Sequence, residues 1–167
     1  MRISTKAVAL AATIALTACG SGQSGEVTNE DGETAEYTID AESGETSMAI
    51  TTEDGATAMQ SGAGVKPSLP DGWSVYPGAT IVNAINVDRA DGSGSMVMMT
   101  VEASADAVIA HYRKQAETTG FPIEMEMTTA TSRLIGGERE DGATFSVSVT
   151  PSEDGEPTMV QLTLAEG

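Results

Sequence analysis

The sequence predicts an α+β fold in which one helix packs on an antiparallel sheet of about six strands, in the order ββαββββ. Three observations lead to this prediction: short segments alternate apolar and polar residues, one stretch has helical spacing, and glycine-containing turns separate the segments. The pattern occupies residues 67–167. Before it we expect a signal peptide at 1–18, and a linker with an acidic stalk of low hydrophobicity or small β-meander at 19–66.

Two strands are expected before the helix. Their alternating apolar positions are Ile81, Ile85, Val87, Val97, Met99 and Val101. The first three are predicted to share one face of the first strand, although Asn83 interrupts the pattern. The Asp91–Gly94 segment, Asp-Gly-Ser-Gly, supplies the turn that joins the two strands.

A helix is expected between Ser104 and Gly120. Ser104 is a suitable N-cap, and Gly120 suits the position just after the helix, where a left-handed backbone is common. Apolar residues recur between them at helical spacing and form a stripe about 100° wide. These residues are Val108, Ile109, Tyr112 and Ala116. The stripe would pack on the sheet.

Four more strands complete the predicted sheet. They are expected around residues 123–127, 134–137, 145–149 and 160–164. Gly136-Gly137 predicts a bulge or bend, and the alternation places Met125 and Met127 in the core. An antiparallel sheet with one helix on one face leaves its other face polar.

The segment before this domain is poor in large apolar residues. Gly20–Gly25 has the composition of a flexible tether. Residues 26–64 offer little to bury beyond Tyr37, Ile39, Met48, Ile50 and Met59. Asp-Gly turns could separate short strands there. Two readings stay open: a marginal meander or a partly disordered stalk.

The first eighteen residues have the layout of an export signal. Arg2 and Lys6 precede a mostly apolar run, Ala7–Leu16, which is shorter than the about 20 residues that a membrane-spanning helix needs. The run ends in Leu16-Thr17-Ala18-Cys19, which resembles the lipobox of bacterial lipoproteins. The alternative is a plain signal that has a cysteine near its end by accident.

The lipobox resemblance implies a location. It implies cleavage between Ala18 and Cys19, a diacylglycerol thioether on Cys19, and usually an acyl chain such as palmitate on the new amino terminus. Two or three chains hold a protein at a membrane, whereas a single chain binds marginally. Gly20 stands where an aspartate would retain a lipoprotein in the inner membrane. The resemblance therefore implies the outer membrane, facing the periplasm.

A second resemblance covers residues 69–164. The Tyr76-Pro77-Gly78-Ala79 segment, the hairpin after it, and a helix that ends in Gly120-Phe121 are similar to small uncharacterised domains of bacterial envelope lipoproteins. That family often has a tryptophan after this glycine and an aromatic pair on the helix, where this chain has His111-Tyr112. The resemblance implies a fold and no reaction.

Charge and cysteine usage exclude several functions. The formal net charge is −17, and it becomes −19 when Arg2 and Lys6 leave with the signal. Such a surface repels the phosphates of nucleic acids, so we expect no nucleic-acid partner. Cys19 is the only cysteine and would carry lipid, so we expect neither a disulfide nor a thiolate nucleophile.

No catalytic constellation is recognisable. His111 is the only histidine, and a serine nucleophile would still need a base and an orienting partner. We therefore predict that the protein is not an enzyme, that it needs no cofactor, and that His111 is a partly exposed helix residue. Its predicted role is that of a lipid-anchored interaction or structural module with an envelope protein as partner.

Trp73 and Tyr76 are the predicted contact residues. Both lie in a loop with several prolines and glycines, and an aromatic side chain beside rigid turns is costly to expose without a use. The competing interpretation is that they plug the open end of a small sheet.

The alternative function is that of a periplasmic cation-binding protein. Thioethers favour Cu(I), and methionines cluster at Met96, Met98 and Met99 and again at Met125 and Met127. Methionine also fills irregular gaps in cores. Ca²⁺ could use the acidic residues, but every Asp-Gly pair lacks the first oxygen ligand of a calcium loop, so turns explain these pairs better.

Overall fold

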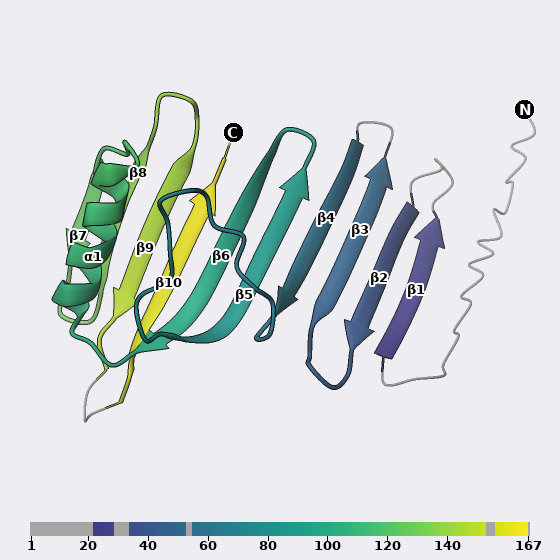
Figure 1. The fold of residues 1–167 in the computed structure, drawn as a ribbon, viewed down its shortest axis with the longest axis horizontal. Coiled ribbons are helices and arrows are strands. Elements are labelled where there is room, and N and C mark those ends of the chain that lie inside the picture. Colours follow the sequence, from purple (N-terminus) through teal and green to yellow (C-terminus); the bar gives the residue numbers. More distant parts are fainter. Residues whose placement is uncertain (1–21, 29–33, 53–54, 153–155, 167) are drawn as a thin grey trace, which may run out of the picture.

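Ten strands hydrogen-bond edge to edge in one antiparallel sheet, in the order β1-β2-β3-β4-β5-β6-β10-β9-β8-β7 (Figure 1). This computed structural model describes residues 22–28, 34–52, 55–152 and 156–166. The strands are β1 Gly22–Thr28, β2 Thr34–Asp40, β3 Thr46–Thr52, β4 Gly55–Gly62, β5 Thr80–Arg89, β6 Gly92–Val101, β7 Met125–Thr128, β8 Arg133–Glu138, β9 Thr144–Thr150 and β10 Thr158–Ala165. One helix, α1, runs over Ala105–Thr118.

The predicted fold class is wrong, because the sheet has ten strands rather than about six and does not stop where the predicted domain begins. Residues of the predicted stalk form β1 to β4, and β4 pairs with β5 in the register Met59↔Val87. β1 even includes Gly22–Gly25, which composition predicts as a tether. The low apolar content of this segment led us to expect too little regular structure in it. A strand that continues an existing sheet gains backbone hydrogen bonds and cross-strand contacts without a core of its own.

The core lies under one part of the sheet. Helix α1 packs against β8 and β9, and the segment between β4 and β5 crosses the same face (Figure 1). The largest fully buried side chains come from α1 and from strands β6, β8, β9 and β10: Tyr112, Met99, Ile135, Leu162, Val97, Val101, Val108, Val147, Val149 and Val160. Ion pairs from α1 to the sheet, Arg113–Glu126 at 2.6 Å and Arg133–Asp106 at 3.3 Å, lie at the surface of this contact.

The helix ends follow from local sequence, as predicted. The Ala107 amide donates to Ser104 Oγ at 3.3 Å, which makes Ser104 the N-cap. At the other end Gly120 has φ +80°, and the Phe121 amide donates to the Ala116 carbonyl at 2.9 Å, as in a Schellman motif. This motif turns the chain so that Phe121 packs into the core.

The irregularity of the sheet is in β5, not at Gly136-Gly137. Both glycines pair regularly with β9, so the predicted bulge there is wrong. Gly137 has a different role, because a Cβ at this position would overlap the carbonyl oxygen of Pro122. In β5 the register shifts between Ile81 and Asn83.

The β5 irregularity decides which side chains reach the solvent. Ile81 pairs with Met99 and packs against the core, whereas Ile85 pairs with Met96 on the opposite face. The expectation that Ile81, Ile85 and Val87 share one face is therefore wrong. One extra residue in the strand reverses the alternation after it.

Candidate binding face

The sheet face that points away from α1 forms one continuous surface, which we name the open face. Cross-strand pairs define it. Tyr37, Met48, Met59 and Val87 are direct neighbours across β2 to β5, and Ile85, Met96, Thr163 and Ser146 are direct neighbours across β5, β6, β10 and β9. Along this face, apolar side chains dominate from β2 to β6, whereas serine, threonine and glutamine follow on β10 and β9.

The strand positions of the open face are nearly free of charge. Its charged strand positions are Arg89 and Glu138, each the last residue of its strand. The acidic strand residues lie on the helix side of the sheet: Glu26, Glu36, Asp40, Asp88 and Glu126. The lack of acidic strand residues on the open face does not follow from composition, because the chain has 25 acidic residues and a net charge of −17.

Methionines collect on the open face. Among the described residues every methionine except Met99 lies there, in the order Met48, Met59, Met96, Met98, Met159, Met127 and Met125 across the sheet. The prediction that Met125 and Met127 belong to the core is wrong, since 59% and 49% of these residues' surfaces are exposed. The strand alternation was recognised correctly, but the core lies on the other side of β7.

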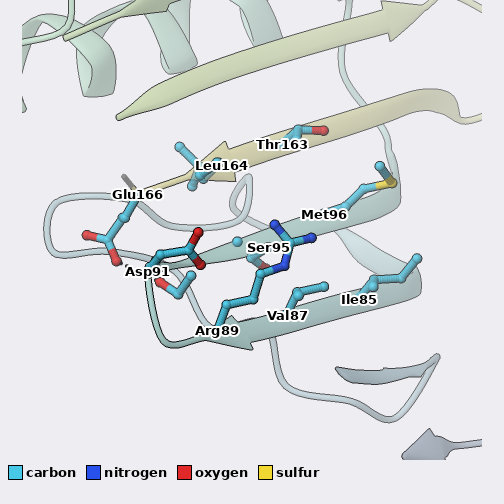
Figure 2. A pocket seen from close by; sticks show the side chains of 13 residues that line it. Ile85, Val87, Arg89, Asp91, Ser95, Met96, Thr163, Leu164 and Glu166 are labelled. Atoms are coloured by element: carbon cyan, nitrogen blue, oxygen red, sulfur yellow. Dashed lines mark hydrogen bonds between the residues drawn. The ribbon is translucent and has the colours of Figure 1, made fainter. Parts of the chain in front are cut away.

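A groove of about 390 Å³ lies on the open face where the middle strands end, at the β5–β6 hairpin and the end of β10. Figure 2 shows Ile85 and Val87 of β5 and Met96 of β6 beside it. The groove is explained by the sequence, because Gly94, which lies opposite Val87, has no side chain to fill it. A Cβ at Gly94 would come no closer than 3.5 Å to another atom, so a larger residue could occupy the groove.

Three charged residues surround one end of the groove. Arg89, Asp91 and Glu166 line it (Figure 2). The Ser93 hydroxyl donates to Glu166 Oε2 at 2.9 Å, and the Glu166 amide donates to the Ser93 carbonyl at 2.8 Å. These bonds hold the end of the chain's last strand beside the hairpin and keep this end of the groove polar.

The loop with the predicted contact residues packs inward. Trp73 is 7% exposed, and its ring lies 5.8 Å from that of Phe121 and 5.3 Å from that of Phe145. Tyr76 is half-buried against the edge of His111, with ring centroids 4.9 Å apart. Both side chains thus lie on the helix side of the sheet, where they close the core.

His111 belongs to a small network that joins α1 to this loop. Gln115 Nε2 donates to His111 Nε2 at 2.7 Å and to Ser74 Oγ at 2.9 Å, while the Ser74 amide donates to Gln115 Oε1 at 3.0 Å. Partial burial lowers the pKa of His111, and the charge of Lys114 lowers it further. The neutral imidazole is thus an acceptor that positions Gln115.

The remaining predicted site residues belong to the predicted lipid anchor. Ala18 and Cys19 lie outside the described residues. In the described ranges, no three histidine, cysteine or acidic side chains gather as metal ligands would. The helix that the structure describes is too short and too polar to span a bilayer.

Comparison with known proteins gives one match. Residues 81–155 match the family model described as START domain-like. The match runs from β5 through β9 and includes α1, Ile85, Val87 and Met96, and it covers less than half of the chain. It indicates a ligand-binding or interaction module. No curated protein and no solved structure matches the chain.

Proposed function

We propose that this protein is a lipid-anchored, non-enzymatic binding module of the cell envelope, and that its open face is the contact surface. One observation carries the proposal: a chain with a net charge of −17 keeps acidic side chains off the strand positions of an entire sheet face, except for Glu138 at its border. The similarity to a START domain-like family supports the same kind of function.

The charge pattern has a physical meaning. A carboxylate that a partner covers must lose its hydration, and this penalty is several kcal/mol when no opposite charge compensates it. An acidic protein that binds a partner therefore does so most easily through a surface without carboxylates. Protein interfaces in general follow the same rule, because their cores are depleted of charged residues and enriched in methionine and aromatic residues. Tyr37, Met59 and Met96 give the open face this composition.

The contact surface can be tested with a photo-crosslinking amino acid at Val87 and, as a matched control, at Asp88. These neighbours on β5 lie on opposite faces of the sheet. Irradiation of intact cells should give a discrete adduct from position 87 and none from position 88, with the bound molecule identified by mass spectrometry. Equal adducts from both positions, or none from position 87, would refute the open face as the contact surface.

The anchor has its own test. Residues 16–19 support lipid attachment at Cys19, and Gly20 supports an outer-membrane location facing the periplasm. Intact mass of membrane-extracted protein should show a chain that starts at residue 19 and carries acyl groups, and Cys19→Ser should move the protein from the membrane to the soluble fraction. Unchanged fractionation of the Cys19→Ser variant contradicts the anchor and leaves the open face untouched.

Copper binding is a second candidate, favoured by one detail of the open face. Met96 and Met98 follow one another on β6, and Met159 on β10 lies diagonally across from Met98. Diagonal neighbours on a sheet face are within reach of long side chains, and thioethers select Cu(I). Titration of the protein with Cu(I) against a competing chelator should give one equivalent bound, lost in Met98→Leu. No competition at micromolar metal would exclude it.

A further inference from the structure

We infer that the open face binds a second copy of this chain, so that two sheets pack face to face in a symmetric dimer. The inference rests on the proposed function, since it names the partner of the same surface. Three properties of the open face carry it: its charge, its area and the arrangement of its apolar side chains.

Charge leaves two copies few ways to approach. Each carries a net charge of −17 before processing, so most of their surfaces repel one another. The helix side presents Glu26, Glu36 and Asp88, and a contact there would desolvate carboxylates of the same sign. On the open face the charged strand positions are Arg89 and Glu138, both at strand ends, and Asp91 and Glu166 lie near Arg89 at one end of the groove.

The face is large enough for a stable dimer. Ten strands about 4.8 Å apart, each about seven residues long at about 3.3 Å per residue, give a face of about 1,000 Å². A specific interface buries about 800 Å² on each partner. Twist reduces the overlap, but two sheets that pack face to face remain within about 30° of each other in strand direction.

The apolar side chains lie where such a contact needs them. Met59, Val87, Ile85 and Met96 occupy the middle strands of the sheet, and serine, threonine and glutamine lie beside them on β10 and β9. Interface cores are likewise depleted of charge and enriched in methionine. Methionine adapts its shape to the opposing surface, which suits a face that must fit its own copy.

Adjacent residues of β4 offer a matched test. Met59 lies on the open face and the exposed Gln60 on the helix side. We expect the full-length protein, extracted in detergent, to have twice the mass of one chain by light scattering. Met59→Glu should halve this mass, because each copy would bury a carboxylate against its partner, whereas Gln60→Glu should leave it unchanged. A single-chain mass for the wild type overturns the inference, and so does a dimer that Met59→Glu leaves intact.

Crosslinking identifies the faces that meet. The sequence has one cysteine, Cys19, so a cysteine introduced at Met96 can be compared with the parent chain as background. A short bismaleimide should join two Met96→Cys chains, and should not join two chains with Asp88→Cys. If Val87 photo-adducts form with another molecule while the wild type has the mass of one chain, the binding face stands and the second copy is overturned. If the photo-adducts are absent and the mass is that of one chain, both proposals fail.

Discussion

The two halves of the sheet contain strands of similar length but differ in what stabilises them. Strands β6, β10, β9 and β8 bury side chains under α1 and the β4–β5 segment. Strands β1 to β4 contribute no side chain to the buried core; the buried residue among them is Gly62. The comparison shows that a packed half can act as a template from which further strands extend by hydrogen bonding and cross-strand pairs.

Local side-chain contacts and hydrogen bonds stabilise the N-terminal half in place of a core. The Tyr37 ring lies over Gly25, where a Cβ would come within 2.6 Å of Tyr37 Oη, so that the ring covers the backbone of the neighbouring strand. Asp40 Oδ1 accepts from the amides of Glu42 at 2.8 Å and Ser43 at 2.9 Å, which closes the β2–β3 turn. These amides hold the pKa of Asp40 below its usual value.

The largest difference between the halves should appear with one substitution made in both. Ile135 is 1% exposed and Ile50 is 36% exposed. Ile135→Ala should lower the free energy of unfolding by about 2–5 kcal/mol, because it leaves a cavity in the core. Ile50→Ala should lower it by about 1 kcal/mol or less, since less apolar area is lost. Urea unfolding followed by circular dichroism measures both, and equal losses would contradict a core confined to one half.

Two glycines on opposite faces of the packed half sharpen the comparison further. Gly137→Ala should destabilise the protein by about 1–3 kcal/mol, because the new methyl group meets the Pro122 carbonyl and must displace the segment after the helix. Gly94→Ala should be almost neutral, since its nearest contact is an ordinary 3.5 Å. Melting temperatures of the two variants provide the measurement. A neutral Gly137→Ala would mean that this segment does not pack on β8.

The N-terminal strands should respond to a single charge. Glu26 and Glu36 lie directly opposite one another on β1 and β2, and like charges in this position are unfavourable. Glu26→Lys should stabilise the pair by about 0.2–1 kcal/mol, seen as slower hydrogen exchange at the amides of β2. Gln23→Lys, on the open face of the same strand, serves as the control. No slowing in Glu26→Lys would show that the pair does not limit the stability of this edge.

The smallest expected effect concerns the contact between α1 and its loop. The pKa of His111 is lowered by burial, so the unfolded chain takes up its proton first as the pH falls below about 6.5. Stability from this contact is therefore complete above that pH and decreases below it. An NMR titration of the single histidine should give a pKa below 6.5. In Gln115→Ala the imidazole becomes more exposed, and its pKa should rise toward 6.5; an unchanged value would contradict the network.

Local features of this fold could be predicted from sequence, and long-range ones could not. Ser104 and Gly120 define the helix ends through contacts with near neighbours, so their residue types were sufficient. The joining of β4 to β5 was missed because Met59 and Val87 lie far apart in sequence and neither marks the pairing. The open face was missed for a related reason: alternation reveals that two faces exist, but not which of them α1 covers.

The extra residue at Val82 has a consequence for how this sequence can change. Side chains alternate between the two faces along a strand, and the extra residue interrupts this alternation once. Ile81 therefore points to the core and Val87 to the open face. Deletion of Val82 would remove the irregularity and leave the later residues on their present faces, because Ile81 and Asn83 already lie on opposite faces and would then follow one another as in a regular strand. Loss of a regularly paired residue such as Ala84 would instead reverse the faces of the residues after it, so that Ile85 and Val87 would leave the open face although their identities were unchanged.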